Sequence, residues 1–233
     1  MSGTPLRFVL DPVGDELTAA LDCEADVFRQ TYGNTIDQLA DEYGPYAEAT
    51  GFMTLLDENC LALATTRFIA PGPAGLKTLN DARRAPWNVD GMRSALAAGI
   101  DPSKTWDIAT IAVRRSSRGS PAAAALYHGI ATAANANNID SIIMIMDARA
   151  RRLLSASGMQ TRALPGTAEG EYLGSPRSIP VWADLREMFD LQRQTNPDAY
   201  RLIYQGIGLD GIALPTDWTW GQHNQTSREP VYS

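Results

Sequence analysis

A run of five apolar side chains, preceded by one serine, places the strongest constraint on the fold. Residues 141–146 read Ser-Ile-Ile-Met-Ile-Met, with no alternation between polar and apolar positions. Such a run is typical of a strand that is buried on both faces of a sheet. Helices are predicted on either side of it, over the Ala-rich residues 121–136 and over 147–157. Gly158 suits the left-handed backbone conformation in which helices commonly end. The pattern therefore predicts an α/β fold.

The rest of the chain supplies short strands and helices at compatible spacing. Strands are predicted over 6–10, 51–56, 60–69, 106–113 and within 172–183, and helices from about residue 11 and over 184–194. Residues 33–50 and 70–105 are expected to be loops broken by short helices. No repeat and no clean linker is present. We expect one domain over 1–185 and a C-terminal extension, 186–233, packed on the same domain.

Composition excludes several classes of protein. With 44% apolar and 20% charged residues, the chain has ordinary globular proportions. Two cysteines and two histidines argue against a disulfide framework and against a metal site. No apolar run reaches the roughly 18–20 residues of a membrane span. The first residues lack the basic and apolar regions of a signal peptide, so a cytoplasmic location is expected.

The charge is unevenly distributed along the chain. The net charge of −7 argues against general nucleic-acid binding. Residues 83–162 nevertheless carry 11 basic and 5 acidic side chains, a balance of +6, while the remainder carries 9 and 22, a balance of −13. Coding bias explains the preference for arginine over lysine, but it does not explain where the positive charge lies. A small, locally bound anion is therefore expected.

The turn at residues 114–120 is the candidate anion site. It joins the strand at 106–113 to a helix for which Ser120 suits the N-cap and Pro121 the first position. A helix N-terminus presents unpaired N–H groups and roughly half a positive charge. Gly119 has no side chain, so a ligand can approach the backbone closely there. Arg115 and Arg118 can bind a pyrophosphate through charge-assisted hydrogen bonds. The alternative is a solvated loop with surface arginines.

The segment Arg-Gly-Ser-Pro-Ala-Ala at 118–123 resembles the acyl-CoA-binding turn of the GNAT superfamily of N-acyltransferases. Arg118 and Ala123 match that turn, and Pro121 replaces its middle glycine and removes one N–H donor. The order of elements over residues 6–185 is also similar. The resemblance implies a GNAT-like fold with a mixed central sheet, and an acyl-CoA or phosphopantetheine-linked acyl donor with no metal.

A narrower likeness is to the acyl-homoserine-lactone synthases and the long-chain N-acyl amino acid synthases. It rests on Phe28, the acidic stretch at 41–43, Arg67 and the strand at 106–113. Asp107 stands in the place of a glutamate in those families, while Ala109, Thr110 and Glu24 replace their serine and two arginines. The loss of the arginines favours an amine acceptor other than S-adenosylmethionine.

Acyl transfer requires a base for the amine and polarisation of the thioester carbonyl. Asp107 is the candidate base, since strand alternation is expected to put residues 107, 109, 111 and 113 on one face. A strand-end aspartate in water, or one paired with Arg67, is the alternative. Arg67 could anchor a substrate carboxylate or phosphate, or be a surface side chain. The candidate donor-binding residues are Ile111, Ala112, Val113, Arg115, Arg118, Gly119 and Ser120.

These observations predict an acyltransferase acting on a small-molecule amine by direct attack. The alternatives are a thioester-binding protein of the same fold, an acyl-CoA decarboxylase or hydrolase, and, less favoured, an autoinducer synthase. The basic run at 149–152 could dock an acidic acyl-carrier protein, or be a solvated helix face. No nucleic-acid partner and no membrane span are expected.

Overall fold

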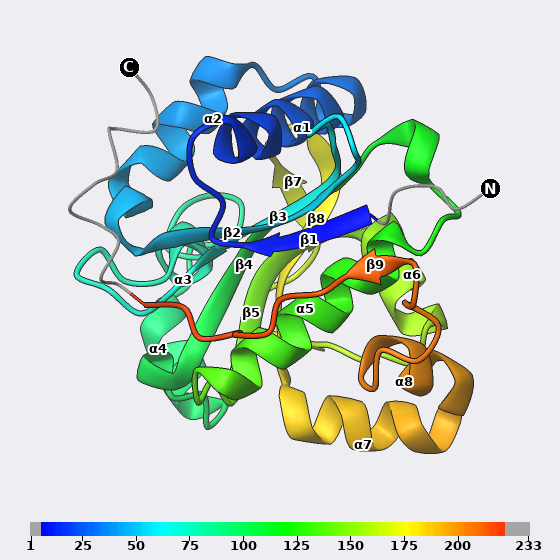
Figure 1. Ribbon diagram of the computed structural model, residues 1–233. Helices are drawn as coiled ribbons and strands as arrows, with labels where there is room; N and C mark the ends of the chain where they lie inside the picture. Colours follow the sequence, from blue (N-terminus) through cyan, green and yellow to red (C-terminus); the bar gives the residue numbers. More distant parts are fainter. Residues whose placement is uncertain (1–5, 222–233) are drawn as a thin grey trace.

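A mixed sheet forms the centre of the protein, whose computed structural model describes residues 6–221 (Figure 1). Within that range the strand order is β6-β8-β5-β4-β3-β2-β1-β9, and β7 pairs with β8. The β4–β5 and β1–β9 pairs are parallel and the others antiparallel. The strands are β1 (Leu6–Leu10), β2 (Thr50–Leu56), β3 (Ala62–Ile69), β4 (Thr105–Val113), β5 (Ser141–Asp147), β6 (Arg162–Ala163), β7 (Gly170–Tyr172), β8 (Ser175–Asp184) and β9 (Ile212–Ala213).

Helices cover both faces of this sheet. In Figure 1, α1 and α2 lie above it, and α5, α7 and α8 lie below. The helices are α1 (Asp15–Tyr32), α2 (Ile36–Tyr43), α3 (Lys77–Asp81), α4 (Gly91–Ala97), α5 (Ala122–Ala136), α6 (Ala148–Ala156), α7 (Leu185–Thr195) and α8 (Pro197–Ile203), with 3-10 turns η1 (Gly44–Ala49), η2 (Pro102–Lys104) and η3 (Arg115–Ser117). None of the helices between residues 6 and 221 has the length and apolar character to cross a membrane.

The predicted elements around the buried strand are confirmed. β5 is buried along most of its length, and Asp147 caps α6 by accepting from the N–H groups of Arg149 and Ala150. Gly158 ends that helix with φ +83°. The helix after the anion turn begins one residue later than predicted. Its N-cap is Pro121, which has no side-chain cap bond, and the Ser120 hydroxyl accepts from the Ala122 N–H at 3.3 Å.

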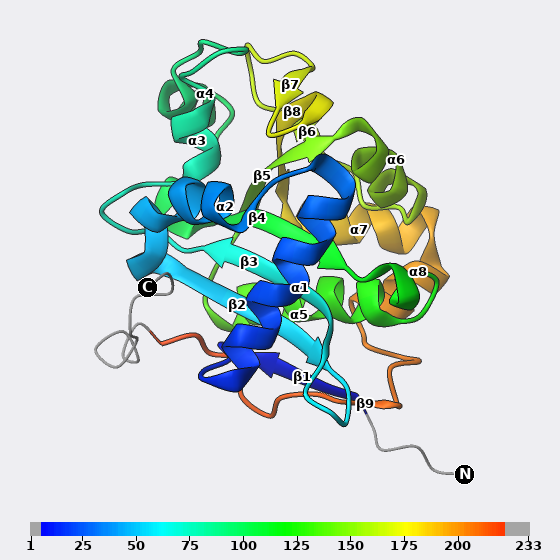
Figure 2. The same cartoon turned by 90° about the horizontal axis from the view of Figure 1, so that it is seen from above.

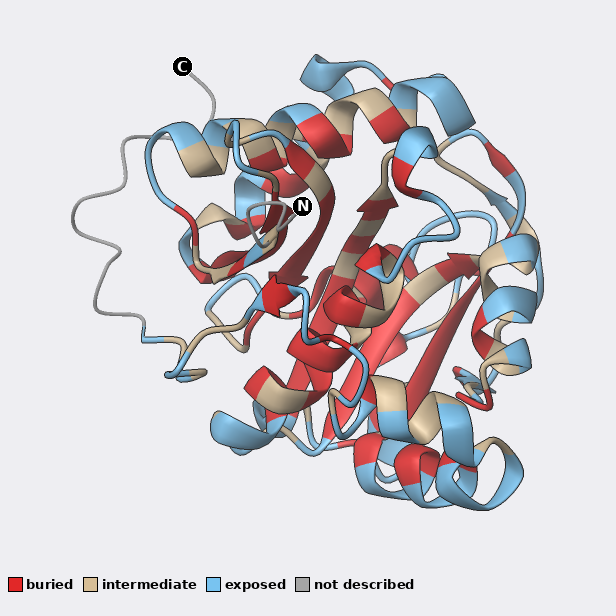
Figure 3. Ribbon diagram, turned by 45° about the vertical axis from the view of Figure 1, so that its right-hand side comes forward, coloured by how far each residue is buried: buried red, intermediate tan, exposed pale blue. Residues whose placement is uncertain are grey.

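The largest core cluster lies between the sheet and the lower helices. Figure 3 shows burial concentrated on the central strands and on α5, with the outer helix faces exposed. Trp106 is 1% exposed and stacks on Phe68 with ring centroids 4.4 Å apart. His128 is buried in α5, where its Nδ1 lies 2.8 Å from the Ile203 carbonyl oxygen, so it fastens α8 to α5.

The C-terminal segment runs back to the far edge of the sheet. After α8, the short strand β9 pairs with β1 through Leu6–Ile212 and Arg7–Ala213. Residues 206–211, which match the Gly-x-Gly-x-x-Gly pattern, form the loop before β9 and begin no helix. Residues 222–233 of the predicted extension lie outside the described range.

Strand β4 is interrupted, and this corrects the predicted alternation. The register against β3 passes from Phe68–Ile108 to Arg67–Thr110, which leaves Ala109 as a bulge. A bulge inserts one extra residue and so inverts the direction in which the later side chains of the strand point. Asp107 and Ala109 therefore face α2 and α3, whereas Ile111 and Val113 pack into the lower core with Ile108. The expectation that residues 107, 109, 111 and 113 share one face is wrong.

Candidate active site

Strands β4 and β5 separate beside this bulge. Their parallel pairing covers only the three residues from Thr105 to Asp107 of β4. Beyond Asp107, the edge of β4 that faces β5 has no β5 partner, so its backbone groups are not bonded to that strand. The gap lies in the middle of the sheet, which is where α/β folds commonly bind ligands.

Asp107 lies at the beginning of this gap and is 1% exposed. Its Oδ2 accepts from the Thr78 N–H at 2.5 Å and its Oδ1 from the Thr78 hydroxyl at 2.9 Å. Burial raises the pKa of the Asp107 carboxyl to about 7, and the two Thr78 bonds oppose the rise only in part. The carboxyl is neither in water nor bonded to Arg67, so both alternatives to a buried group are wrong.

Arg67 is buried rather than on the surface. Its side chain is 2% exposed, and its Nε donates to Glu24 Oε1 at 2.9 Å while Nη2 bonds Oε2. The guanidinium lies 4.3 Å from the Tyr43 ring centroid and 4.6 Å from that of Phe52. Glu24 also accepts from the Thr110 hydroxyl at 2.5 Å. The pair therefore ties α1 to β3 and to the bulged strand.

Four ionisable side chains, two of them buried and two half-buried, form a second group that was not predicted as a unit from the sequence. The Lys77 ammonium donates to Glu42 Oε2 at 2.7 Å, to Asp81 Oδ2 at 2.5 Å and to the Tyr172 hydroxyl at 2.8 Å. The Tyr172 hydroxyl in turn donates to Asp81 Oδ2 at 2.6 Å. We call Glu42, Lys77, Asp81 and Tyr172 the lysine cluster. The sequence features that point to this cluster are the acidic stretch at 41–43 and the spacing of four residues between Lys77 and Asp81.

The charges of the lysine cluster support one another. Burial lowers the pKa of Lys77, but Asp81 and Glu42 outweigh this effect, and the net shift is upward. Burial and the neighbouring Asp81 raise the pKa of Tyr172 far above its ordinary value. At neutral pH the lysine is therefore charged and the phenol is neutral.

Tyr43 connects the lysine cluster to the bulge. Its hydroxyl lies 3.4 Å from the Ala109 carbonyl oxygen, and its ring centroid lies 5.3 Å from Lys77 Nζ. On the other side of the cluster, Lys77 directly precedes Thr78, which binds Asp107. The lysine cluster, the bulge and the buried carboxyl thus form one continuous site at the end of α2 and the start of α3.

The predicted anion turn lies at the opposite end of β4. Arg115 and Arg118 are exposed, and Gly119 adopts φ +84° just before α5. The Ser120 hydroxyl donates to the Ser117 carbonyl at 2.6 Å. The preceding Arg114 holds the turn in place, because it donates to Asp26 Oδ2 of α1 at 2.5 Å.

Helix α1 ends beside this turn. Figure 2 shows it crossing the sheet towards α6. The hydroxyl of Tyr32, its last residue, donates to Asp147, the N-cap of α6. Burial and this bond raise the pKa of Tyr32, and the nearby charges of Arg149 and Arg118 lower it. The C-terminus of α1, the anion turn and the N-terminus of α6 therefore meet at one end of the gap.

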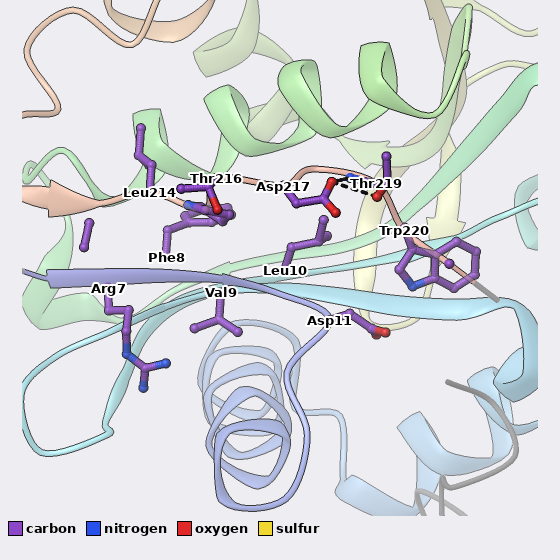
Figure 4. A pocket seen from close by; sticks show the side chains of 13 residues that line it. Arg7, Phe8, Val9, Leu10, Asp11, Leu214, Thr216, Asp217, Thr219 and Trp220 are labelled. Carbon is purple, nitrogen blue, oxygen red and sulfur yellow. Dashed lines mark hydrogen bonds between the residues drawn. The ribbon is translucent and has the colours of Figure 1, made fainter. Parts of the chain in front are cut away.

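A separate groove lies at the sheet edge (Figure 4). It has a volume of about 540 Å³ and runs between β1 and the segment 213–221, with Arg7, Leu10 and Trp220 among its lining residues. Strands β2 and β3 separate it from β4, so it is not part of the gap. No cluster of His, Cys, Asp and Glu within residues 6–221 has the arrangement of a metal site.

No family model and no curated protein matches this chain. Solved structures with similar folds include BjaI, a CoA-dependent acyl-homoserine lactone synthase solved with SAM and isopentyl-CoA, at 15% identity and a TM-score of 0.59 over 91% of this chain and 94% of that one. FeeM, an N-acyl amino acid synthase from uncultured soil microbes, is 15% identical with a TM-score of 0.57 over 80% and 95% of the two chains. The AHL synthase LasI is 13% identical with a TM-score of 0.54 over 78% and 91%.

The protein has the GNAT fold. This confirms the fold class expected from the sequence. The identities of 13–15% establish the fold alone, so the chemistry must be argued from the residues of the site.

Proposed function

We propose that the protein is an N-acyltransferase that moves an acyl group from a CoA or acyl-carrier-protein thioester to a small-molecule amine. The observation that carries this proposal is the arrangement along β4. A buried carboxyl of raised pKa, Asp107, lies at one end of the open edge, and the Arg118-Gly119 turn lies at the other. Six strand residues span about 20 Å, a distance that an extended pantetheine arm can bridge.

The open edge of β4 suits the donor. The residues after Asp107 lack β5 partners, so backbone groups of Ile111, Ala112 and Val113 that do not pair with β3 are available to pantetheine amides and to the thioester oxygen. A donor bound in this way would take hydrogen bonds on β4 that β5 does not make beyond Asp107.

The anion turn suits the phosphate end of the donor. Arg115 and Arg118 would neutralise a pyrophosphate or phosphate, while Gly119 and Ser120 bring backbone close to it. Pro121 carries no N–H, so α5 offers one donor fewer than other helix starts.

The transfer step follows from these positions. The amine nitrogen attacks the thioester carbon, a C–N bond forms, and the C–S bond breaks as the thiolate leaves. The Thr78 hydroxyl, which donates to Asp107, accepts the amine proton and passes its own to the carboxylate. Helix α6 carries no tyrosine to act as an acid, so the thiolate either leaves unaided or takes a proton from water.

A carrier-protein donor has a matching surface in α6. Arg149 and Arg152 are exposed there, and the neighbouring Leu153 is 64% exposed. An acidic carrier could place its phosphopantetheine between this helix and Arg118. Comparing acyl-CoA with an acyl-carrier protein as donor, in wild type and Arg152→Glu, decides between the two sources.

The test is thiol release from acyl-CoA and acyl-carrier donors in the presence of an amine panel. Transfer predicts release that depends on the amine, with N-acyl products by mass spectrometry. Asp107→Asn should lower kcat by 100-fold or more while donor affinity is retained, since a general base typically contributes 10²–10⁴-fold. The rate of the wild type should rise with pH through about 7, where Asp107 loses its proton.

Three other outcomes are distinguishable. Thiol release without an amine indicates a hydrolase, and donor binding without release indicates a thioester-binding protein. Formation of a lactone from S-adenosylmethionine indicates an autoinducer synthase, which the side chains Glu24 and Thr110 disfavour. Either of the first two results would contradict the proposed transfer. Lactone formation would itself be acyl transfer to an amine, and it would overturn only the expectation of an acceptor other than S-adenosylmethionine.

A further inference from the structure

The charges around the bulge select among acceptor amines. We propose that the acceptor is an organic amine without a carboxylate, which binds as a cation with its ammonium group against Glu42. This inference rests on the proposed N-acyl transfer and names its substrate class.

The first support is that both buried cations of the site already have partners. A lysine ammonium has three protons to donate, and those of Lys77 go to Glu42, Asp81 and Tyr172. Arg67 binds Glu24 through two nitrogens between two aromatic rings. A substrate carboxylate would have to compete with Asp81 or Glu24, both of them buried, for a positive charge that is already neutralised. Displacing either acid would leave it buried without its counter-charge.

The second support is the sign of the remaining charge. Within the lysine cluster two carboxylates, Glu42 and Asp81, face one ammonium, and Asp107 adds a third acid nearby. Arg84 approaches Asp81 at 3.9 Å, but its side chain is 74% exposed and water screens most of its effect. The site therefore attracts a cation, and a second carboxylate next to these acids would be repelled.

The third support is the position of Glu42. Its side chain is 30% exposed, which makes it the more accessible of the two acids that bind Lys77. Lys77 binds its Oε2, and no second hydrogen-bond partner of this side chain lies within residues 6–221. Oε1 can therefore accept from an incoming ammonium.

The location also suits the reaction. Glu42 is next to Tyr43, which contacts the Ala109 carbonyl at the bulge, and its partner Lys77 is next to Thr78, which binds Asp107. A cation held at Glu42 thus lies beside the thioester position and beside the group that takes its proton. The same contact that recognises the ammonium would orient the amine for attack.

The experiment compares pairs of acceptors that differ only in the carboxylate: tyramine with tyrosine, tryptamine with tryptophan, and agmatine with arginine. We expect kcat/KM to be at least 10-fold higher for the amine of at least one pair. Glu42→Gln should lower kcat/KM for that amine at least 10-fold, mainly through KM. Asp37→Asn is the control, because this carboxylate is exposed on the same helix, and it should change kcat/KM less than twofold.

Failure of this inference is distinct from failure of the proposed function. Faster transfer to the amino acids, lost in Arg84→Ala, would overturn the inference while transfer itself stands. If no acceptor releases thiol, the proposed function fails, and calorimetric titration with tyramine and tyrosine then decides. Tyramine binding that Glu42→Gln abolishes supports the charge argument, whereas equal binding of the two, or none, overturns it.

Discussion

Replacing Asp107 with asparagine tests the buried carboxyl directly. The asparagine has the same shape, and its carbonyl oxygen can accept from the Thr78 N–H while its amide donates to the Thr78 hydroxyl oxygen. The substitution therefore removes the titration of the group and keeps its two contacts. Any pH-dependent difference in stability between the two proteins reports the pKa of Asp107.

The magnitude follows from the raised pKa. The carboxyl ionises near 3.8 in the unfolded chain and at about 7 in the folded protein. Between pH 3.8 and about 7, the carboxyl holds its proton in the folded state but not in the unfolded state. The protonated Asp107 therefore contributes its full stabilisation of the fold below about pH 4, and this stabilisation is lost as the pH rises through 7. Each pH unit is worth about 1.4 kcal/mol. From pH 5 to pH 8, wild type should lose about 3 kcal/mol relative to Asp107→Asn.

Urea unfolding at pH 5, 6, 7 and 8 measures this difference. The control is Asp101→Asn, because the side-chain and backbone bonds of Ser103 lower the pKa of the exposed Asp101 and keep its titration below this range. The difference in the free energy of unfolding between wild type and Asp101→Asn should not change from pH 5 to pH 8. If the difference between wild type and Asp107→Asn is also constant from pH 5 to pH 8, Asp107 is ionised throughout, and both the raised pKa and its use as a base near neutrality are wrong.

Two further predictions concern packing around the site. Glu24→Gln should lower the free energy of unfolding by about 3–5 kcal/mol, since it removes the carboxylate that pairs with the buried Arg67 guanidinium. Glu16→Gln, which removes the exposed ion pair of Glu16 with Arg7, should lower the free energy of unfolding by under about 1 kcal/mol. Similar losses in the two variants would show that burial of the pair does not set its contribution. Gly91→Ala should destabilise by about 1–3 kcal/mol and reduce activity, because a Cβ there would lie 2.2 Å from the Leu79 carbonyl oxygen of α3. Gly44→Ala, where a Cβ meets nothing within 4 Å, should be neutral by chemical denaturation, and an equal loss in both would refute the steric cause.

Much of the fold was predictable because its signals are local. The continuous apolar run at 142–146, the neighbouring strands predicted over 51–56 and 60–69, and the glycine at 158 each depend on contacts within a few residues, and all are present. The Arg-rich turn before α5 was likewise predictable, since arginines that precede a helix start are a feature of consecutive residues; its binding of an anion stays a prediction. The helix N-cap shifted by one residue, an error of boundary rather than of element.

The bulge at Ala109 could not be predicted, because it arises from the register between β3 and β4 and not from β4 alone. A two-residue period in the sequence carries no sign of the point at which it is interrupted. The consequence was a wrong face for Ile111 and Val113. Asp107, which precedes the bulge, lies against α3, in a stretch that was expected from the sequence to be a loop broken by short helices.

By itself, the sequence determined the α/β class, the order of the elements and the presence of a basic turn before α5, since each depends on neighbouring residues. Only the tertiary structure decided which charges are available. It paired Arg67 with Glu24, 43 residues away in the sequence. It also paired Lys77 with Glu42, 35 residues away, and with Asp81, four residues away. Whether a charge can bind a substrate depends on what already neutralises it, and that is set by chain segments that meet only in the folded protein.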